Sequence, residues 1–288
     1  MSFADVIYRL LPESYFKKIR NLYYRINQLL FPPLSEQNFK KVLSDKLGIE
    51  KGMVVYVHSS IDKLNLDFSP YRLLVLLLDF VGAEGTLVFP CWHYQGRAED
   101  YLNQPDAVFN VRRSPTTMGL LPELARRHKN AVRSLHPTTS IVAIGALAHE
   151  LIDEHQLDIY PNGEKSPMYK IMQYNSRIIG LGEKVVSLSF VHVVEDSLKN
   201  KFPLQTLSDE AVSGIVIDGD KNRRELTTLV PHKNIQNRDT TAFFKKHIRK
   251  DICNSFSYKG VNYFTTNPVL LFNELKTLAE QGKTIYGY

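Results

Sequence analysis

The sequence of 288 residues contains only two cysteines, Cys91 and Cys253, which stand far apart. They can form neither a disulfide framework nor a CxxC metal site, and we expect no bound metal. No apolar run approaches the roughly 20 residues of a membrane-spanning helix. The N-terminus lacks the apolar core and cleavage site of a signal peptide, which predicts a cytoplasmic protein. The absence of G-x-S-x-G, Walker A and G-x-G-x-x-G motifs argues against α/β-hydrolases and the two standard nucleotide-phosphate loops.

The composition is that of a soluble globular protein, with 43% hydrophobic and 23% charged residues. The formal net charge is +6, but the basic residues are scattered and accompany no known nucleic-acid-binding motif. We therefore expect no nucleic-acid partner. A positive field favours neutral or anionic small molecules over polycations as ligands.

The apolar pattern predicts an α/β protein. A strand over residues 53–57, a helix over 70–80 closed by Gly82 and a strand over 85–89 indicate a parallel βαβ crossover. Further elements are expected in order along the chain: a helix over 118–128, strands over 141–145 and 177–181, a helix over 190–199, a hairpin around 218–220, a helix over 240–250 and a closing helix over 268–281. The predicted fold is a three-layer α/β/α domain over residues 34–288 with a mostly parallel central sheet.

Residues 1–33 are expected to form a helical N-terminal extension. Apolar residues recur there at near-helical spacing with lysines and arginines between them, and Pro32-Pro33 ends the pattern. One interpretation is a helix packed on the main body or on a second subunit in a homodimer. The other is a basic amphipathic helix that makes peripheral contact with anionic lipid.

Polar segments stand at the ends of several predicted strands, and ligand sites of α/β sheets lie beyond the carboxyl ends of strands. They are His58-Ser59-Ser60, the segment Pro90-Cys91-Trp92-His93-Tyr94, the loop Ser114-Pro115-Thr116-Thr117-Met118-Gly119, and Arg133-Ser134-Leu135-His136-Pro137-Thr138-Thr139-Ser140. The last segment combines a cation, hydroxyls, an imidazole and a rigid proline directly before a strand. Such hydroxyls can bind a ligand or simply cap helices and turns.

The segment around His192 offers acid–base chemistry. His192 and Glu195 are three residues apart and share one face of a predicted helix. A carboxylate beside an imidazole orients the ring and raises its basicity. The pair supplies only two ligands, which argues against a metal site. An alternative is a covalent acyl-enzyme at Cys91 with help from His93, because residues i and i+2 share a strand face.

Six of these segments together resemble the aminoglycoside N3-acetyltransferase family, which is distinct from the GNAT acetyltransferases. In order, they are Val57–Ser60, Phe80–Pro90, Ser114–Gly119, Arg133–Ser140, Gly163–Met168 and the segment ending His192-Val193-Val194-Glu195. The resemblance implies an α/β/α fold, acetyl-CoA as co-substrate and direct acetyl transfer to an amine.

The resemblance also implies roles for individual residues. His192 would be the general base, with Glu195 and Ser189 beside it. The residues implied on the coenzyme side are His58, Ser59, Ser60, Ser114, Thr116, Met118, Gly119, Arg133, Ser134, His136 and Ser140. Those implied on the acceptor side are Cys91, Trp92, His93 and Tyr94.

The chain departs from the family pattern where the acceptor would bind. Leu188 and Ser189 stand where the family usually has Asn-Thr, and Asn110 replaces an aspartate. Together with the basic net charge, this favours an amino sugar of a surface-polysaccharide precursor, linked to a nucleotide or a lipid, as the acceptor. The alternatives are aminoglycoside 3-N-acetylation that confers antibiotic resistance, and a non-catalytic CoA-binding paralogue.

Overall fold

The computed structural model describes residues 29–233, 235 and 238–287, together with Lys18, Ile19, Leu22 and Ile26. Its centre is a seven-stranded sheet with strand order β4-β5-β2-β1-β6-β10-β9. The strands are β1 (Val54–Ser59), β2 (Thr86–Pro90), β4 (Val132–Arg133), β5 (Ile141–Gly145), β6 (Ser176–Leu181), β9 (Cys253–Tyr258) and β10 (Val261–Thr266).

The parallel part of the sheet is its centre. β1 pairs in parallel with β2 and with β6, whereas the outer pairs are antiparallel. The predicted βαβ crossover is confirmed: helix α4 (Pro70–Val81) joins β1 to β2. The Ser69 hydroxyl caps its first turn by accepting from the Arg72 N–H, and Gly82 ends it with φ of 74°.

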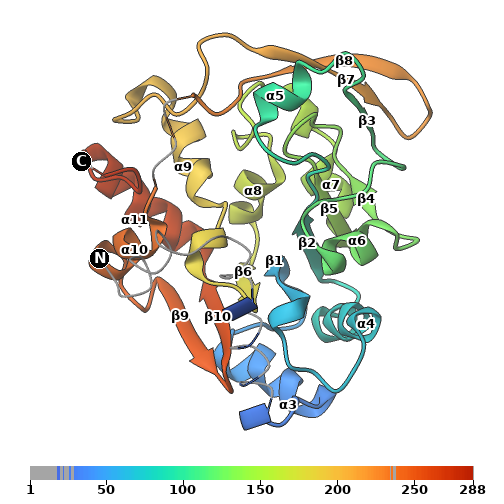
Figure 1. Cartoon of the computed structure of the whole chain (residues 1–288), viewed down its shortest axis with the longest axis vertical. Helices are drawn as coiled ribbons and strands as arrows, with labels where there is room; N and C mark the ends of the chain where they lie inside the picture. Colours follow the sequence, from blue (N-terminus) through green and yellow to red (C-terminus); the bar gives the residue numbers. More distant parts are fainter. Residues whose placement is uncertain are drawn as a thin grey trace.

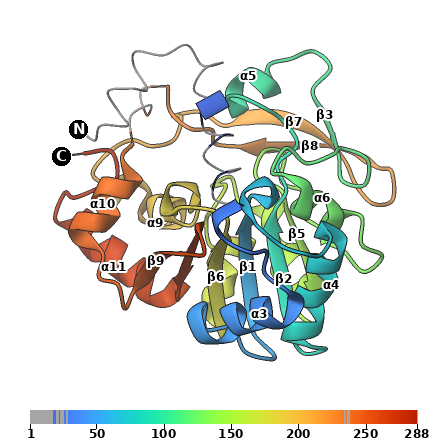
Figure 2. The same ribbon diagram turned by 60° about the horizontal axis from the view of Figure 1, so that its bottom comes forward.

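Helices cover both faces of this sheet, which confirms the three-layer α/β/α architecture (Figures 1 and 2). Alternate residues of β1 enter opposite cores, Val54 and Tyr56 on one face and Val55 and Val57 on the other. Packed on the Val55 face are α3 (Glu36–Lys41), α4 and α6 (Leu120–Arg126). Packed on the Tyr56 face are α7 (Ala148–Ile152), α8 (Pro167–Lys170), α9 (Val191–Leu198), α10 (Thr240–His247) and α11 (Pro268–Glu280).

The predicted hairpin around residues 218–220 forms outside the main sheet. β7 (Val212–Ile217) and β8 (Arg223–Thr228) are antiparallel, and β3 (Val108–Asn110) joins β7 in parallel. Figure 1 shows this small sheet, with α5 (Ala98–Leu102) beside it, at the end of the molecule opposite α3.

The predicted extension over residues 1–33 lies largely outside the described residues. The described residues between Lys18 and Leu30 are helical, and Leu29 and Leu30 are exposed. Whether this segment contacts lipid or a second subunit therefore stays a prediction. No helix in the described ranges is both long and apolar enough to span a bilayer.

Candidate active site

A cavity of about 500 Å³ lies at the carboxyl ends of the central strands. His58 comes from the end of β1, and Pro90, the last residue of β2, leads into Trp92. The chain that follows β6 supplies Ser189 and then helix α9. Because neighbouring parallel strands end at one edge, segments far apart in sequence meet here, as expected for an α/β sheet.

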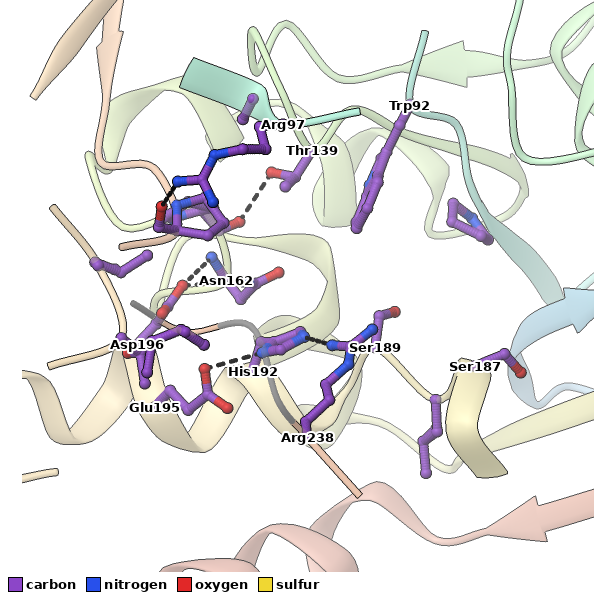
Figure 3. Close-up of a pocket in the computed structure, with 18 of the residues that line it drawn as sticks. Trp92, Arg97, Thr139, Asn162, Ser187, Ser189, His192, Glu195, Asp196 and Arg238 are labelled. Carbon is purple, nitrogen blue, oxygen red and sulfur yellow. Dashed lines mark hydrogen bonds and ion pairs between the residues drawn. The ribbon is translucent and has the colours of Figure 1, made fainter. Parts of the chain in front are cut away.

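Helix α9 directs His192 and Glu195 into this cavity (Figure 3). Its valines, including Val191 and Val194, pack into the core beneath, which leaves the opposite face of the helix for polar side chains. The Nδ1 atom of His192 lies 2.9 Å from Oε2 of Glu195. The Tyr286 hydroxyl donates to the other carboxylate oxygen at 2.9 Å. The carboxylate is thus held from two sides and fixes the imidazole ring.

The other ring nitrogen of His192 faces an arginine. Nη1 of Arg238 lies 2.9 Å from His192 Nε2, as Figure 3 shows. A guanidinium can only donate, so Nε2 is the acceptor here. The hydrogen bonds therefore assign a neutral ring with its proton on Nδ1, shared with Glu195.

The pKa of His192 is shifted in the opposite direction from those of His58 and His93. Burial lowers the pKa of His192, but the charge and hydrogen bond of Glu195 raise it, and the net shift is upward. Burial lowers the pKa of His58 to about 3, and burial and the Arg133 charge lower that of His93 to about 3. The Glu195 carboxylate therefore favours proton uptake by His192, as suits a general base.

Asp196 of α9 also lines the cavity. It is buried, and its Oδ2 accepts from the backbone N–H of Asn162 at 2.6 Å and from its side-chain amide at 3.0 Å. Burial and the charge of Glu195 raise the pKa of Asp196 to about 7. Asp196 thus orients Asn162 rather than presenting a free carboxylate.

Two buried polar atoms of the cavity lining have no partner among the described residues. They are Nε2 of His58 and Oδ1 of Asn162. A buried polar atom without a hydrogen bond is costly, so such atoms in a cavity indicate where a polar ligand or water binds.

Seven residues of the sequence-based prediction line the cavity together. They are His58, Trp92, Tyr94, Met118, Ser189, His192 and Glu195. Eleven others do not line it: Ser59, Ser60, Cys91, His93, Ser114, Thr116, Gly119, Arg133, Ser134, His136 and Ser140.

The loop over residues 114–119 supports the cavity wall. The Thr116 hydroxyl donates to the Trp92 carbonyl at 2.8 Å and accepts from the Met118 N–H at 3.1 Å. The Ser114 hydroxyl accepts from the Asn110 N–H at 2.9 Å. The Thr116 hydroxyl thus positions Trp92 and Met118, which themselves face the cavity.

The segment over residues 133–140 is largely buried and holds neighbouring loops through hydrogen bonds. The Arg133 guanidinium donates to the Cys91 carbonyl at 2.5 Å and to the Ser114 carbonyl at 2.6 Å, and it lies 4.6 Å from the Phe109 ring centre. The His136 ring is fully buried, and its Nδ1 accepts from the Thr139 N–H at 3.1 Å. Arg133 and His136 are therefore bound within the protein. Of this segment, Thr139 lines the cavity.

The covalent alternative at Cys91 is disfavoured by geometry. Cys91 is fully buried, and burial raises the pKa of its thiol, so the thiolate is scarce. His93 stacks on Phe109 at 4.3 Å between ring centres, and its Nε2 lies 2.9 Å from the Tyr101 hydroxyl. Within the described ranges, no cluster of three or more His, Cys, Asp or Glu side chains could hold a metal ion.

Several cavity residues were not predicted from the sequence. Arg97, Asn162, Arg238 and Tyr286 stand in segments without a motif, and they reach the cavity only through folding. Asp196 could have been found, because it directly follows Glu195 on the predicted helix.

Comparison with known proteins identifies relatives over most of this chain. The sequence model of the family described as aminoglycoside 3-N-acetyltransferase matches residues 56–262. The aminoglycoside N(3)-acetyltransferase IX of Micromonospora chalcea is 30% identical over 176 residues. That match covers 57% of this chain and 62% of the relative, so the chain spans about three fifths of the relative's length.

Solved structures share the fold. The crystal structure of the aminoglycoside acetyltransferase AAC(3)-Xa superposes with a TM-score of 0.76 at 20% identity, covering 92% of this chain and 98% of that chain. A structure of AAC-IIIb in a binary complex with CoASH gives a TM-score of 0.73 at 19% identity, covering 87% of this chain and 97% of that chain.

Proposed function

The chain belongs to the aminoglycoside 3-N-acetyltransferase family, and from that premise we propose that it transfers an acetyl group from acetyl-CoA to an amine, with His192 as general base. The observation that carries this proposal is the hydrogen bond between His192 and Glu195 at the wall of a cavity of about 500 Å³. The family resemblance implies the role of catalytic base for His192, and its bond to Glu195 suits that role.

The cavity suits a polar thioester co-substrate. Its unpartnered atoms, His58 Nε2 and Asn162 Oδ1, offer a ring nitrogen and an amide oxygen to such a ligand. Trp92 and Met118 add an apolar wall. Bound acetyl-CoA would supply the electrophilic thioester carbonyl. The resemblance of AAC-IIIb, which binds CoASH, supports this assignment through the shared fold.

The proposed reaction needs one proton acceptor. The amine nitrogen forms a bond to the thioester carbonyl carbon, and the carbon–sulfur bond breaks. His192 Nε2 takes the proton that the nitrogen loses, and the leaving thiolate receives a proton, which gives an amide and CoASH. Glu195 stabilises the imidazolium formed in between, because its carboxylate lies 2.9 Å from the opposite ring nitrogen.

Aminoglycosides are the first acceptors to test. Relatives such as the Micromonospora enzyme carry that substrate in their names. The nucleotide- or lipid-linked amino sugar that the charge pattern predicts has no such support from the relatives, and it stays the second candidate.

We expect His192→Ala to lower turnover by about 10²-fold or more, because the attacking amine loses its proton acceptor. Binding of acetyl-CoA should change little, since the ring contributes mainly to the proton transfer. Thiol release measured with an amine panel reports the turnover, and calorimetry reports the binding.

The matched control is His149→Ala, which removes an exposed imidazole beside Asp153 and should leave turnover unchanged. Equal thiol release by wild type and His192→Ala would contradict the assignment of the base. Absence of thiol release with every amine, despite acetyl-CoA binding, would instead favour a non-catalytic CoA-binding protein.

A further inference from the structure

Arg238 is hydrogen-bonded to the ring nitrogen with which His192 would accept a proton. The lone pair of His192 Nε2 accepts a hydrogen bond from Arg238 Nη1 at 2.9 Å. While that bond is present, Nε2 cannot take a proton from an amine. Arg238 must therefore leave Nε2 before the proposed reaction can proceed.

Arg238 has no charge partner that holds it elsewhere. It takes part in no ion pair within the described ranges, and its side chain is exposed at the cavity. The two carboxylates on the cavity lining have other partners: Glu195 is bound to His192 and Tyr286, and Asp196 is bound to Asn162. The cavity thus contains a guanidinium whose charge is not neutralised.

We propose that Arg238 binds an anionic oxygen group, a carboxylate or a phosphate, carried by the acceptor amine, and that this binding frees His192. The proposal rests on the acetyl transfer proposed above, but it ranks an anionic acceptor above the aminoglycosides that the names of the relatives suggest. A guanidinium forms stronger, bidentate hydrogen bonds with an anion than with a neutral ring nitrogen, so the anion draws Arg238 away.

A purely cationic acceptor lacks such a group. Its ammonium groups would meet the guanidinium of Arg238, whereas that of Arg97, on the other side of the cavity (Figure 3), is paired with Glu99 at 3.7 Å. Like charges brought together in a partly buried site repel, and the described lining offers no free carboxylate to offset this. The charges therefore select an amine that also carries a negative charge.

The test compares acceptors matched except for charge. Glucosamine 6-phosphate is compared with glucosamine, β-alanine with β-alaninamide, and gentamicin serves as the polycation. In wild type we expect kcat/KM to be about tenfold or more higher for the anionic member of at least one pair. Arg238→Gln should abolish that preference, so that the two members of each pair are used with similar kcat/KM. Arg249→Gln, at an exposed arginine paired with Asp251, is the control that should retain it.

A second measurement does not depend on turnover. Nitrogen-15 NMR of the His192 ring should show a shift of the Nε2 resonance when glucosamine 6-phosphate or β-alanine is added to wild type, and no shift in Arg238→Gln. The phosphate and carboxylate probes distinguish the two kinds of anion.

Equal or better use of gentamicin, a preference retained in Arg238→Gln, or an Nε2 resonance that neither anion moves would overturn the inference. The proposed acetyl transfer would survive each of those results as long as thiol release required His192. Conversely, wild type could release no thiol with any amine and still show the Nε2 shift with an anion. That result would refute the proposed acetyl transfer but not the anion site.

Discussion

The pKa of a buried histidine in this protein depends on the side chains around it. His58 is buried without a charged partner, and burial lowers its pKa to about 3. His192 is also desolvated, but Glu195 reverses the direction and raises its pKa. The spacing of His192 and Glu195 predicted this pair from the sequence, whereas nothing in the sequence predicted Arg238 or Tyr286 as its neighbours.

Replacing Glu195 tests whether its carboxylate offsets the effect of burial on the pKa of His192. Because Glu195 raises the pKa of His192, Glu195→Gln should lower that pKa and move the acid limb of the kcat/KM profile to lower pH. The turnover rate should fall by about 10²-fold, since the ring loses its orienting carboxylate. A pH–rate profile in the presence of saturating acetyl-CoA measures both effects.

The control is Asp153→Asn. It removes an exposed carboxylate that lies 3.3 Å from Nδ1 of His149. It should leave the profile unchanged. An acid limb that stays in place or moves to higher pH in Glu195→Gln would contradict the proposed role of Glu195.

At the scale of elements, β6 matters because it lies between β1 and β10. Gly180 of β6 pairs with His58 on one side and with Phe264 on the other. A Cβ atom at Gly180 would overlap the Phe264 ring. The missing side chain thus lets that ring pack across β6, 5.8 Å from the His58 ring.

We expect Gly180→Ala to lower the free energy of unfolding by about 2 kcal/mol, because the added methyl overpacks the junction of three strands. Urea denaturation measures the change. Gly219→Ala in the β7–β8 turn, where the nearest atom is 3.6 Å away on the flexible Arg112 side chain, should change it by less than about 1 kcal/mol. Similar effects of the two substitutions would show that the packing at Gly180 is not tight.

At the scale of the whole molecule, the cavity joins segments from both halves of the chain. Trp92 and Arg97 follow β2, whereas Arg238 and Tyr286 come from the last fifth of the sequence. A ligand that bridges these segments binds only the folded chain, so its binding energy adds to the stability of the whole fold.

Acetyl-CoA at 100 times its dissociation constant should therefore raise the free energy of unfolding by about 2.7 kcal/mol. Urea denaturation with and without acetyl-CoA measures this, with acetate at equal concentration as the control. His192→Ala should show the same increase. An unchanged denaturation midpoint at saturating acetyl-CoA would argue against a coenzyme site in this protein.

Local sequence patterns were enough to predict most of the central elements and the pairing of His192 with Glu195. Hydrophobic periodicity and capping residues act over a few residues, so the crossover through α4, the β7–β8 hairpin and the common face of His192 and Glu195 could be predicted. The shared motifs likewise indicated the family. These features depend on neighbours along the chain, which the sequence states directly.

Which polar side chains face the cavity depends on contacts between distant parts of the chain. Arg133 and His136 carry suggestive chemistry but are buried among the protein's own hydrogen bonds. Arg238 stands 46 residues from His192 and Tyr286 stands 91 residues from Glu195, yet both contact the pair. Such contacts depend on how strands and helices pack across the whole sheet, and no local pattern encodes that packing.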